Sequence, residues 1–333
     1  MPSESQIIAR LRERVAINDN VLLGIGDDAA VLKVPCEHDL IACCDLMVED
    51  VHFRAEWTPA LLLGRKSLAV NLSDVAAMGA VPKFAMISIA LPDWCSADFV
   101  DELFEGIYEL ANASGVSVIG GDTSSSPDSL FIDISVIGEC ERGKAITRRG
   151  ANVGDSIYVS GSLGASALGL SFLEGGFRLS ESQQLNDPRR QAVLKHLSPE
   201  PQLALGRAIG EAGLATAMID ISDGLSTDLW HILDESGVGA VIYDAAIPIA
   251  ECVRSVSADQ PGIDPLSLAL NGGEEYELLF TVHSENRERV VALAETLGVT
   301  LTLIGEITAE KRLNLERAGG IESLPASGYE HMI

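Results

Sequence analysis

The chain has 333 residues, which is more than a single hydrophobic core usually serves, so we expect two domains. Hydrophobic residues make up 47% and charged residues 22% of it, as in ordinary soluble globular proteins. The net charge of −26 argues against a nucleic-acid partner and against an anionic membrane surface, because both are bound through a surplus of Lys and Arg.

The hydrophobic pattern of the first 140 residues predicts a mixture of helices and strands. Apolar residues recur at helical spacing in three segments, at residues 4–15, 60–79 and 99–113. Shorter apolar runs predict strands at residues 31–34, 40–44, 84–91, 116–119 and 130–137. A segment rich in Gly, Arg and Lys follows, and there we expect the boundary between an N-terminal domain over 1–142 and a C-terminal domain over 150–333.

The second half repeats the mixture, so the fold class we expect is α/β with mixed sheets in two domains. Strands are predicted at residues 156–160, 217–221, 238–243, 276–282 and 300–304. Helices are predicted after residues 161–164 and at 200–213, 226–236 and 285–297. The polar segments 174–199 and 253–265 indicate an irregular excursion and a loop.

Cysteine usage and the N-terminal segment indicate a cytoplasmic protein. None of the six cysteines forms a C-x-x-C pair, which favours free thiols in a reducing compartment. The N-terminal residues are polar and charged and lack the apolar core of a signal peptide. No apolar run approaches the roughly 20 residues of a membrane span.

Aspartates recur beside glycines or at the ends of apolar runs, where α/β folds place ligands. These acidic segments are Gly24–Asp28, Asp45, Asn71–Asp74, Gly120–Asp122 and Asp220–Gly224. Gathered carboxylates repel one another unless cations lie between them. The pattern therefore predicts a site for several Mg²⁺ ions and an anionic ligand such as a nucleotide.

Each acidic segment also has an ordinary structural explanation. Gly and Asp are turn formers, and Asp74 could cap its helix or pair with Arg65 or Lys66. The basic pair Arg148-Arg149 could belong to a solvated linker, although a bound phosphate needs a positive charge nearby. His52 lies between apolar residues, where histidine is usually structural, and the acidic run that begins at Glu274 could be a plain loop.

Seven strings taken together are more specific than any one of them. They are GIGDDAAVL, NLSDVAAMGAVPKF, IGGDTS, ITRRGANVGDSIYVSG, IDISDGLSTDL, GGEEYELLF and the terminal GYEH. In this order, from residue 24 to 331, they resemble the thiamine-monophosphate kinase family of the aminoimidazole ribonucleotide synthetase-like ATP-binding superfamily. The resemblance implies two α/β domains, a homodimer formed through the N-terminal domains, and ATP in a cleft lined by both domains.

The activity that the resemblance implies is ATP-dependent phosphorylation of thiamine monophosphate to thiamine diphosphate, the last step in making that cofactor. By position, the Mg²⁺ ligands would be Asp28, Cys43, Cys44, Asp45, Asp74, Asp122, Asp220 and Asp223. The ATP contacts would be Tyr108, Gly121, Asp122, Arg148 and Ser222. The contacts to thiamine monophosphate would be His52, Glu274 and Tyr329. No general base is expected, because the acceptor phosphate is already an anion.

The chain departs from the family at Cys43 and Cys44, where the family usually has Ser or Thr before the Asp. A thiol is a soft ligand and a poor one for Mg²⁺, so the change matters only if the family ligand is the hydroxyl rather than a backbone carbonyl.

Three other readings of the chain stay open. One is a superfamily relative that acts on a different nucleophile. Another is a nucleotide or metal sensor without catalysis. The third is a calcium-stabilised structural protein, against which the lack of an EF-hand loop pattern argues.

Overall fold

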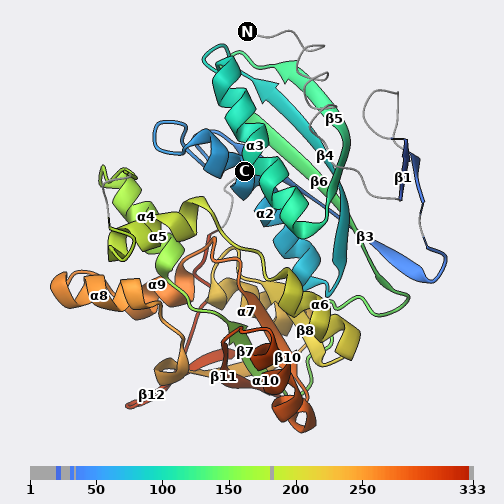
Figure 1. The fold of residues 1–333 in the computed structure, drawn as a ribbon. Helices are drawn as coiled ribbons and strands as arrows, with labels where there is room; N and C mark the ends of the chain where they lie inside the picture. Colours follow the sequence, from blue (N-terminus) through green and yellow to red (C-terminus); the bar gives the residue numbers. More distant parts are fainter. Residues whose placement is uncertain (1–19, 24–30, 34, 181–183, 330–333) are drawn as a thin grey trace. The chain divides into compact units, whose positions relative to one another are not determined.

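The computed structural model describes residues 20–23, 31–33, 35–180 and 184–329, and Figure 1 traces the chain. The helix expected over 4–15 and the proposed ligand Asp28 lie outside the described residues. The chain divides into two compact units, Met1–Val75 with Ala80–Gly143, and Ala76–Gly79 with Lys144–Ile333. The domain limits expected at residues 142 and 150 stay a prediction.

The first unit is built on a four-stranded sheet in the order β3-β6-β4-β5. Only β4 and β5 are parallel, and the other neighbours are antiparallel. Its strands are β3 (His38–Val48), β4 (Val81–Leu91), β5 (Ser117–Ser125) and β6 (Phe131–Glu141). A separate pair of short strands is formed by β1 (Val21–Leu23) and β2 (Val31–Leu32).

Two long helices, α2 (Ala60–Ala77) and α3 (Ala97–Ser114), lie against one face of this sheet (Figure 1). They cross closely because Gly64 and Gly106 lack side chains, and a Cβ at either position would overlap a backbone carbonyl of the other helix. Ser96 caps the start of α3, since its Oγ accepts the N–H of Phe99 at 3.1 Å. This packing fixes the face of α2 that carries Asn71 and Asp74.

The second unit contains a seven-stranded sheet in the order β13-β12-β9-β11-β7-β10-β8. Of these neighbours only β12 and β9 are parallel. The strands are β7 (Ser156–Ser160), β8 (Ala215–Asp220), β9 (Gly239–Tyr243), β10 (Leu278–Val282), β11 (Leu301–Thr308), β12 (Leu313–Arg317) and β13 (Gly320–Ser323).

Helices cover both faces of the second sheet. The helices are α4 (Ala165–Glu174), α5 (Pro188–Leu197), α6 (Leu203–Ala212), α7 (Leu225–Ser236), α8 (Glu251–Asp259), α9 (Pro265–Asn271) and α10 (Arg287–Thr296), with short 3-10 turns η1 (Asp244–Ala246) and η2 (Ser284–Asn286). Alternate residues of β7 enter two cores, one shared with α7 and α9 and the other with α6 and α10. A third apolar cluster joins α4, α5 and α8.

Several sequence-based predictions of elements were wrong or too short. The excursion expected at 174–199 contains α5, and the loop expected at 253–265 contains most of α8 and the start of α9. These helices have few apolar residues because each buries only a narrow stripe in the α4–α5–α8 cluster. Strands β12 and β13 were not predicted. Among the described residues, no helix is long and apolar enough to cross a membrane.

Candidate active site

In the first unit, a buried amide joins two of the acidic segments. Asn71, on α2, has no exposed surface, and its Oδ1 accepts the backbone N–H of Asp45 at 3.1 Å. Its Nδ2 donates to the carbonyl of Ser67 at 3.2 Å, so the orientation of the amide is fixed from its own helix. The sulfur of Cys43 lies 3.4 Å from the carbonyl oxygen of Asn71. The fold therefore brings Cys43 and Asp45 of β3 to the side chains of α2.

The electrostatics of this group reflect gathered negative charge. Burial and the nearby Asp133 raise the pKa of Asp45. Burial, Asp74 and Asp45 together hold the pKa of the Cys43 thiol far above its usual range. The thiol stays protonated at neutral pH, so it is a poor ligand for a hard cation. A cation that approaches here would find carboxylate oxygens, the ligands that Mg²⁺ prefers.

Cys44 faces the opposite side of the sheet from Cys43 and Asp45. Side chains alternate along a strand, and Cys44 is exposed together with its neighbours Leu40 and Leu46. Its thiol donates to Oδ1 of Asp133 at 3.2 Å. A metal ion on the Asp45 side could therefore use Cys44 only through its backbone.

The Gly120-Gly121-Asp122 segment lies inside β5, so the strand expected over residues 116–119 continues through the glycines instead of ending before them. Asp45 likewise lies within β3 rather than at its end. Gly121 pairs with Ile87 of β4, and a Cβ at this glycine would overlap the carbonyl oxygen of Ile87. Asp122 is exposed, and its Oδ1 accepts the N–H of the following Thr123 at 3.0 Å. Gly121 thus lets β5 pass close to β4 just before the exposed carboxylate of Asp122.

The other two sequence-predicted residues of the first unit are held differently. His52 lies in the turn after β3, where its Nδ1 accepts the N–H of Val48 at 3.0 Å. Tyr108 is buried in α3, with its ring 6.0 Å from that of Phe104. The Tyr108 side chain is thus enclosed by its neighbours, and its contact with a nucleotide stays a prediction.

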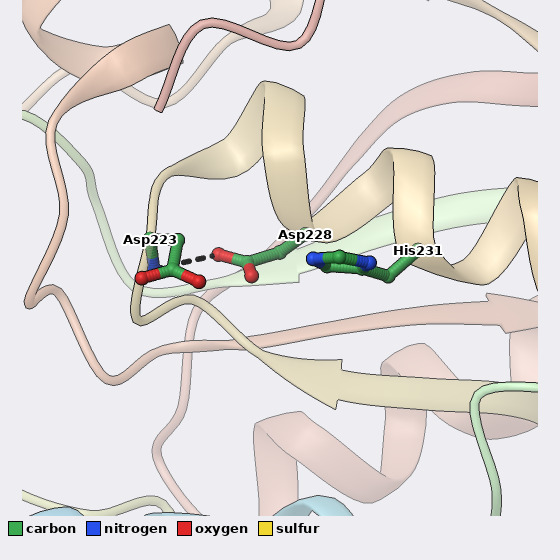
Figure 2. A group of neighbouring side chains, drawn as sticks. All are labelled: Asp223, Asp228 and His231. Carbon is green, nitrogen blue, oxygen red and sulfur yellow. Dashed lines mark hydrogen bonds between the residues drawn. The ribbon is translucent and has the colours of Figure 1, made fainter. Parts of the chain in front are cut away.

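In the second unit, the site residues lie on the loop between β8 and α7. Asp220 is the last residue of β8, opposite Leu278 of β10, and is buried. The chain then turns, so Ser222 and Asp223 lie in the loop and α7 begins at Leu225. Figure 2 shows Asp223, Asp228 and His231 in line beside this loop. Their ligand atoms lie within 4.8 Å of one another.

Asp228, in the first turn of α7, organises the loop. Its Oδ2 accepts the backbone N–H groups of Ser222, Asp223 and Gly224 at 3.1, 3.1 and 3.0 Å. Burial, followed by the charges of Asp220 and Asp223, raises the pKa of Asp228 to about 8. Three carboxyl groups are therefore crowded at this strand end, and a bound cation would reduce the repulsion between them.

Two further segments hold the other side of the same loop. The N–H of Glu274 donates to the carbonyl of Ser222 at 2.7 Å, and the N–H of Tyr329 donates to that of Asp223 at 3.0 Å. Glu274 has a positive φ of 60°, which is uncommon outside glycine and occurs at functional sites. Its Oε2 lies 3.0 Å from Nδ1 of the buried His196. Two of the three residues predicted to recognise the acceptor, Glu274 and Tyr329, thus flank the loop that carries Ser222 and Asp223.

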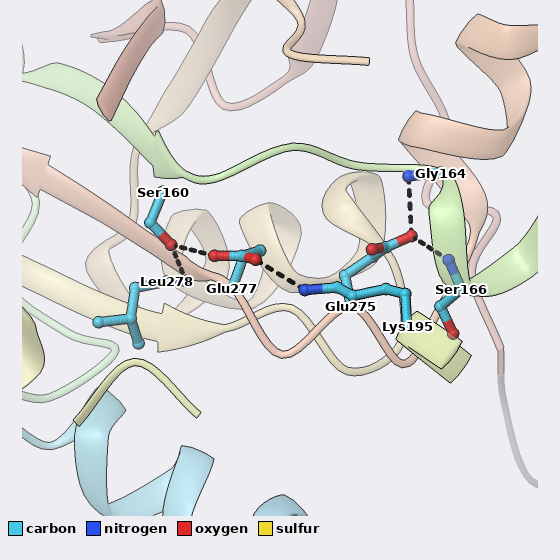
Figure 3. A network of polar contacts seen from close by, with 7 residues as sticks. All are labelled: Ser160, Gly164, Ser166, Lys195, Glu275, Glu277 and Leu278. Carbon is cyan, nitrogen blue, oxygen red and sulfur yellow. Dashed lines mark hydrogen bonds and ion pairs between the residues drawn. The ribbon is translucent and has the colours of Figure 1, made fainter. Parts of the chain in front are cut away.

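A buried polar network fixes the segment that follows Glu274 (Figure 3). Oε1 of Glu275 accepts the N–H groups of Gly164 and Ser166 at 2.7 and 3.0 Å, at the start of α4. Glu277 accepts from the hydroxyl of Ser160 and from the ammonium of Lys195, both at 2.7 Å. Each of these carboxylates is almost fully enclosed, so the network leaves the segment little freedom.

Arg148 lies apart from Ser222 and Asp223. It is exposed in the loop after β6. Its carbonyl accepts a hydrogen bond from Ser236, at the last residue of α7 and so at the opposite end of that helix from Ser222.

Sequence reasoning did not identify Asp228, Lys195 or His196. Asp228 lies four residues after Gly224. This spacing brings its side chain back to the loop only because α7 starts at Leu225, and the sequence does not fix that start. Lys195 and His196 lie on α5, which was itself missed. No pattern in the sequence links that helix to the segment after Glu274.

Comparisons with known proteins agree with this architecture. The family models described as AIR synthase related protein, N-terminal and C-terminal domain, match residues 26–140 and 152–317. Thiamine-monophosphate kinase of Escherichia coli strain K12 is 38% identical over 331 residues, 98% of each chain.

Two solved structures are also similar. The crystal structure of thiamine-monophosphate kinase from Stenotrophomonas maltophilia K279a has a TM-score of 0.84 at 37% identity, covering 93% of this chain and 95% of that one. AaThiL complexed with AMPPCP and TMP has a TM-score of 0.79 at 30% identity, covering 90% and 89%. The chain therefore belongs to the thiamine-monophosphate kinase family, among the AIR synthase related proteins.

Proposed function

We propose that the chain transfers the γ-phosphate of ATP to thiamine monophosphate and so forms thiamine diphosphate. The observation that carries this proposal is the β8–α7 loop, where Ser222 and Asp223 follow Asp220 and accept hydrogen bonds from Glu274 and Tyr329. An acidic, metal-suited loop beside a pair of acceptor-recognition residues is what a phosphotransferase with a cationic acceptor requires. The similar complex with AMPPCP, an ATP analogue, and TMP supports the same pair of ligands.

The roles we assign follow the sequence expectation, adjusted by the geometry. Asp220 and Asp223 in one unit, and Asp45, Asp74 and Asp122 in the other, are the proposed ligands of Mg²⁺, together with Asp28 from the sequence expectation. The thiols of Cys43 and Cys44 are not suited to it, because one is held protonated and the other faces away from Asp45. Bound Mg²⁺ would supply the charge neutralisation that lets one phosphate approach another.

Different residues would bind the nucleotide and the acceptor. Ser222, Gly121 and Arg148 are the proposed ATP contacts, with the guanidinium supplying positive charge to the phosphates. Glu274 would offset the positive charge of the thiamine ring system, and Tyr329 would stack on it. His52 is the third proposed acceptor contact.

Transfer would be direct, without a general base or a phosphoenzyme. The second pKa of a phosphate monoester is near ~6, so the acceptor oxygen is already a nucleophile at neutral pH. The chain's own contribution is then to align the two phosphates and to exclude competing acceptors. A chemically stable labelled enzyme after incubation with γ-labelled ATP would contradict this route.

The decisive test is formation of thiamine diphosphate from ATP, Mg²⁺ and thiamine monophosphate, followed by chromatography. We expect product with the wild-type chain and with Asp234→Asn, an exposed residue of α7. We expect none with Asp74→Asn. Binding of AMPPCP without any product from the wild type would instead favour a superfamily relative with another acceptor, or a sensor.

We also propose a cytoplasmic homodimer. All six cysteines are free thiols, which supports a reducing compartment. The sheet face that carries Cys44 exposes Leu40, Leu46 and Met86 at 52%, 51% and 38%, an apolar surface of the kind that dimers bury. Leu46→Lys should give a monomer in light scattering, whereas Leu303→Lys, on β11 of the other unit, should leave the dimer intact.

A further inference from the structure

Asp228 makes an arrangement that an ordinary helix-start carboxylate does not make. Acidic residues in the first turn usually interact with the N–H groups of their own helix. Here the oxygen accepts from three successive N–H groups that precede the helix, those of Ser222, Asp223 and Gly224. The carboxylate therefore organises the loop rather than the helix.

The loop backbone is held from both sides. Its N–H groups converge on Asp228, while the carbonyls of Ser222 and Asp223 accept from Glu274 and Tyr329. Gly224 completes the turn with a φ of 120°, and a Cβ there would lie 2.9 Å from backbone atoms of Asn271. Few alternative paths remain for Ser222 and Asp223 in the loop between β8 and α7.

A buried carboxylate in this place is costly, which makes a purely structural explanation insufficient. Asp228 is 1% exposed, and it lies beside the like charges of Asp220 and Asp223. Oδ2 alone takes the N–H groups of Ser222, Asp223 and Gly224, so truncating Asp228 would remove one acceptor from all three.

We propose that Asp228 is a positioning residue for phosphoryl transfer: by gathering these three N–H groups it fixes Ser222 and Asp223 in the orientation that binds the nucleotide and its metal ion. The inference rests on the proposed function of these two residues. Asp228 itself touches no substrate in this role, and it acts through the loop. Outer partners of this kind typically change metal affinity or activity by roughly 10–100-fold.

The test compares three variants with the wild type. Asp228→Ala removes the acceptor, Asp228→Asn replaces the carboxyl by an amide of the same shape, and Asp234→Asn is an exposed control on the same helix. Calorimetry measures the affinity for AMPPCP in the presence of Mg²⁺, and steady-state assays measure kcat, both KM values and the half-saturating Mg²⁺ concentration. Thermal melting reports whether each variant is folded.

We expect Asp228→Ala to weaken Mg²⁺-dependent AMPPCP binding and to raise the Mg²⁺ requirement, each by roughly tenfold or more, with Asp228→Asn in between. The KM for thiamine monophosphate should change less than twofold in both. Thr227→Val supplies the reverse pattern, because Oγ1 of Thr227 accepts the N–H of Gly328 and so supports Tyr329. It should raise the KM for thiamine monophosphate and leave the Mg²⁺ requirement unchanged.

The proposal is overturned if Asp228→Ala lowers the melting temperature but binds AMPPCP and Mg²⁺ as the wild type does. It is also overturned if the Ala variant does not fold and the folded Asn variant has wild-type affinity and Mg²⁺ requirement. The affinity measurement does not need turnover. A wild-type chain that binds AMPPCP without making thiamine diphosphate would refute the proposed function and still decide the role of Asp228.

Discussion

Replacing Gly121 by alanine should destabilise the first unit, whereas the same change at the adjacent Gly120 should not. Gly121 has a φ of 152°, a conformation that residues with a Cβ rarely adopt. A Cβ there would approach the carbonyl oxygen of Ile87 more closely than the 3.0 Å that real Cβ atoms respect. At Gly120 no heavy atom lies within 4 Å of the added Cβ. The two glycines therefore form a matched pair with opposite expectations.

Two contributions set the size of the effect. A non-glycine residue in a disfavoured backbone region costs about 1–3 kcal/mol. Forcing an extra methyl against well-packed backbone costs about another 1–3 kcal/mol, since Ile87 lies in a central strand and cannot move freely. The free energy of unfolding should thus fall by about 2–6 kcal/mol in Gly121→Ala. The matching fall in the melting temperature is roughly 5–20 °C.

The assay is urea and thermal unfolding of both variants, followed by circular dichroism. Gly120→Ala should stay within about 0.5 kcal/mol of the wild type, as expected for a change that meets no neighbour. The reasoning is refuted if the two variants have equal stability, because the predicted difference comes entirely from the path of β5 past Ile87.

Three further predictions follow from the contacts of single residues. Burial raises the pKa of Glu275 to about 7 from 4.5, so between these pH values the folded state holds a proton that the unfolded chain releases. The free energy of unfolding should therefore fall by about 3 kcal/mol as pH rises from 4.5 to 7. Glu275→Gln should remove this part of the pH dependence, measured by urea unfolding at pH 5 and pH 8. An equal slope in both proteins would show that Glu275 does not carry it. Cys44→Thr should keep activity and the Mg²⁺ requirement, since the thiol faces away from Asp45; a large loss in a magnesium titration would place that side chain in the site. His196→Ala should raise the KM for thiamine monophosphate several-fold and leave that for ATP within about twofold, because Glu274 loses a partner at 3.0 Å; equal changes in both KM values would contradict this.

The parts of the fold that the sequence predicted are those with a strong local pattern. Strand β7 was placed correctly because all five of its residues are buried and lie between turn-forming residues. The start of α7 followed from the Asp223-Gly224 turn. By contrast, α5 opens after a polar run and is capped by Asp187, with Pro188 in its first turn, so its apolar stripe was too narrow to register as a helix.

For the candidate site, the sequence identified carboxylates but not what orients them. Asp45 and Asp122 were expected at strand ends, yet they lie within β3 and β5. The sequence could not reveal this, because hydrophobic runs end at such residues whether the strand stops or merely becomes exposed. The hydrogen bonds of Asn71 and Asp228 depend on the meeting of a helix with a strand or loop, which no local pattern encodes.

The two units use one physical device on different scaffolds. In each, the backbone N–H of a proposed metal ligand donates to a buried side-chain oxygen from a helix: Asp45 to Asn71 of α2, and Asp223 to Asp228 of α7. An N–H near a carboxylate can otherwise bind a carboxylate oxygen, as the N–H of Thr123 binds Asp122. At Asp223 the N–H of the following residue, Gly224, is likewise held by Asp228. The acceptor is an amide at Asp45 and a carboxyl at Asp223, so two different side chains hold a proposed metal ligand in the same way.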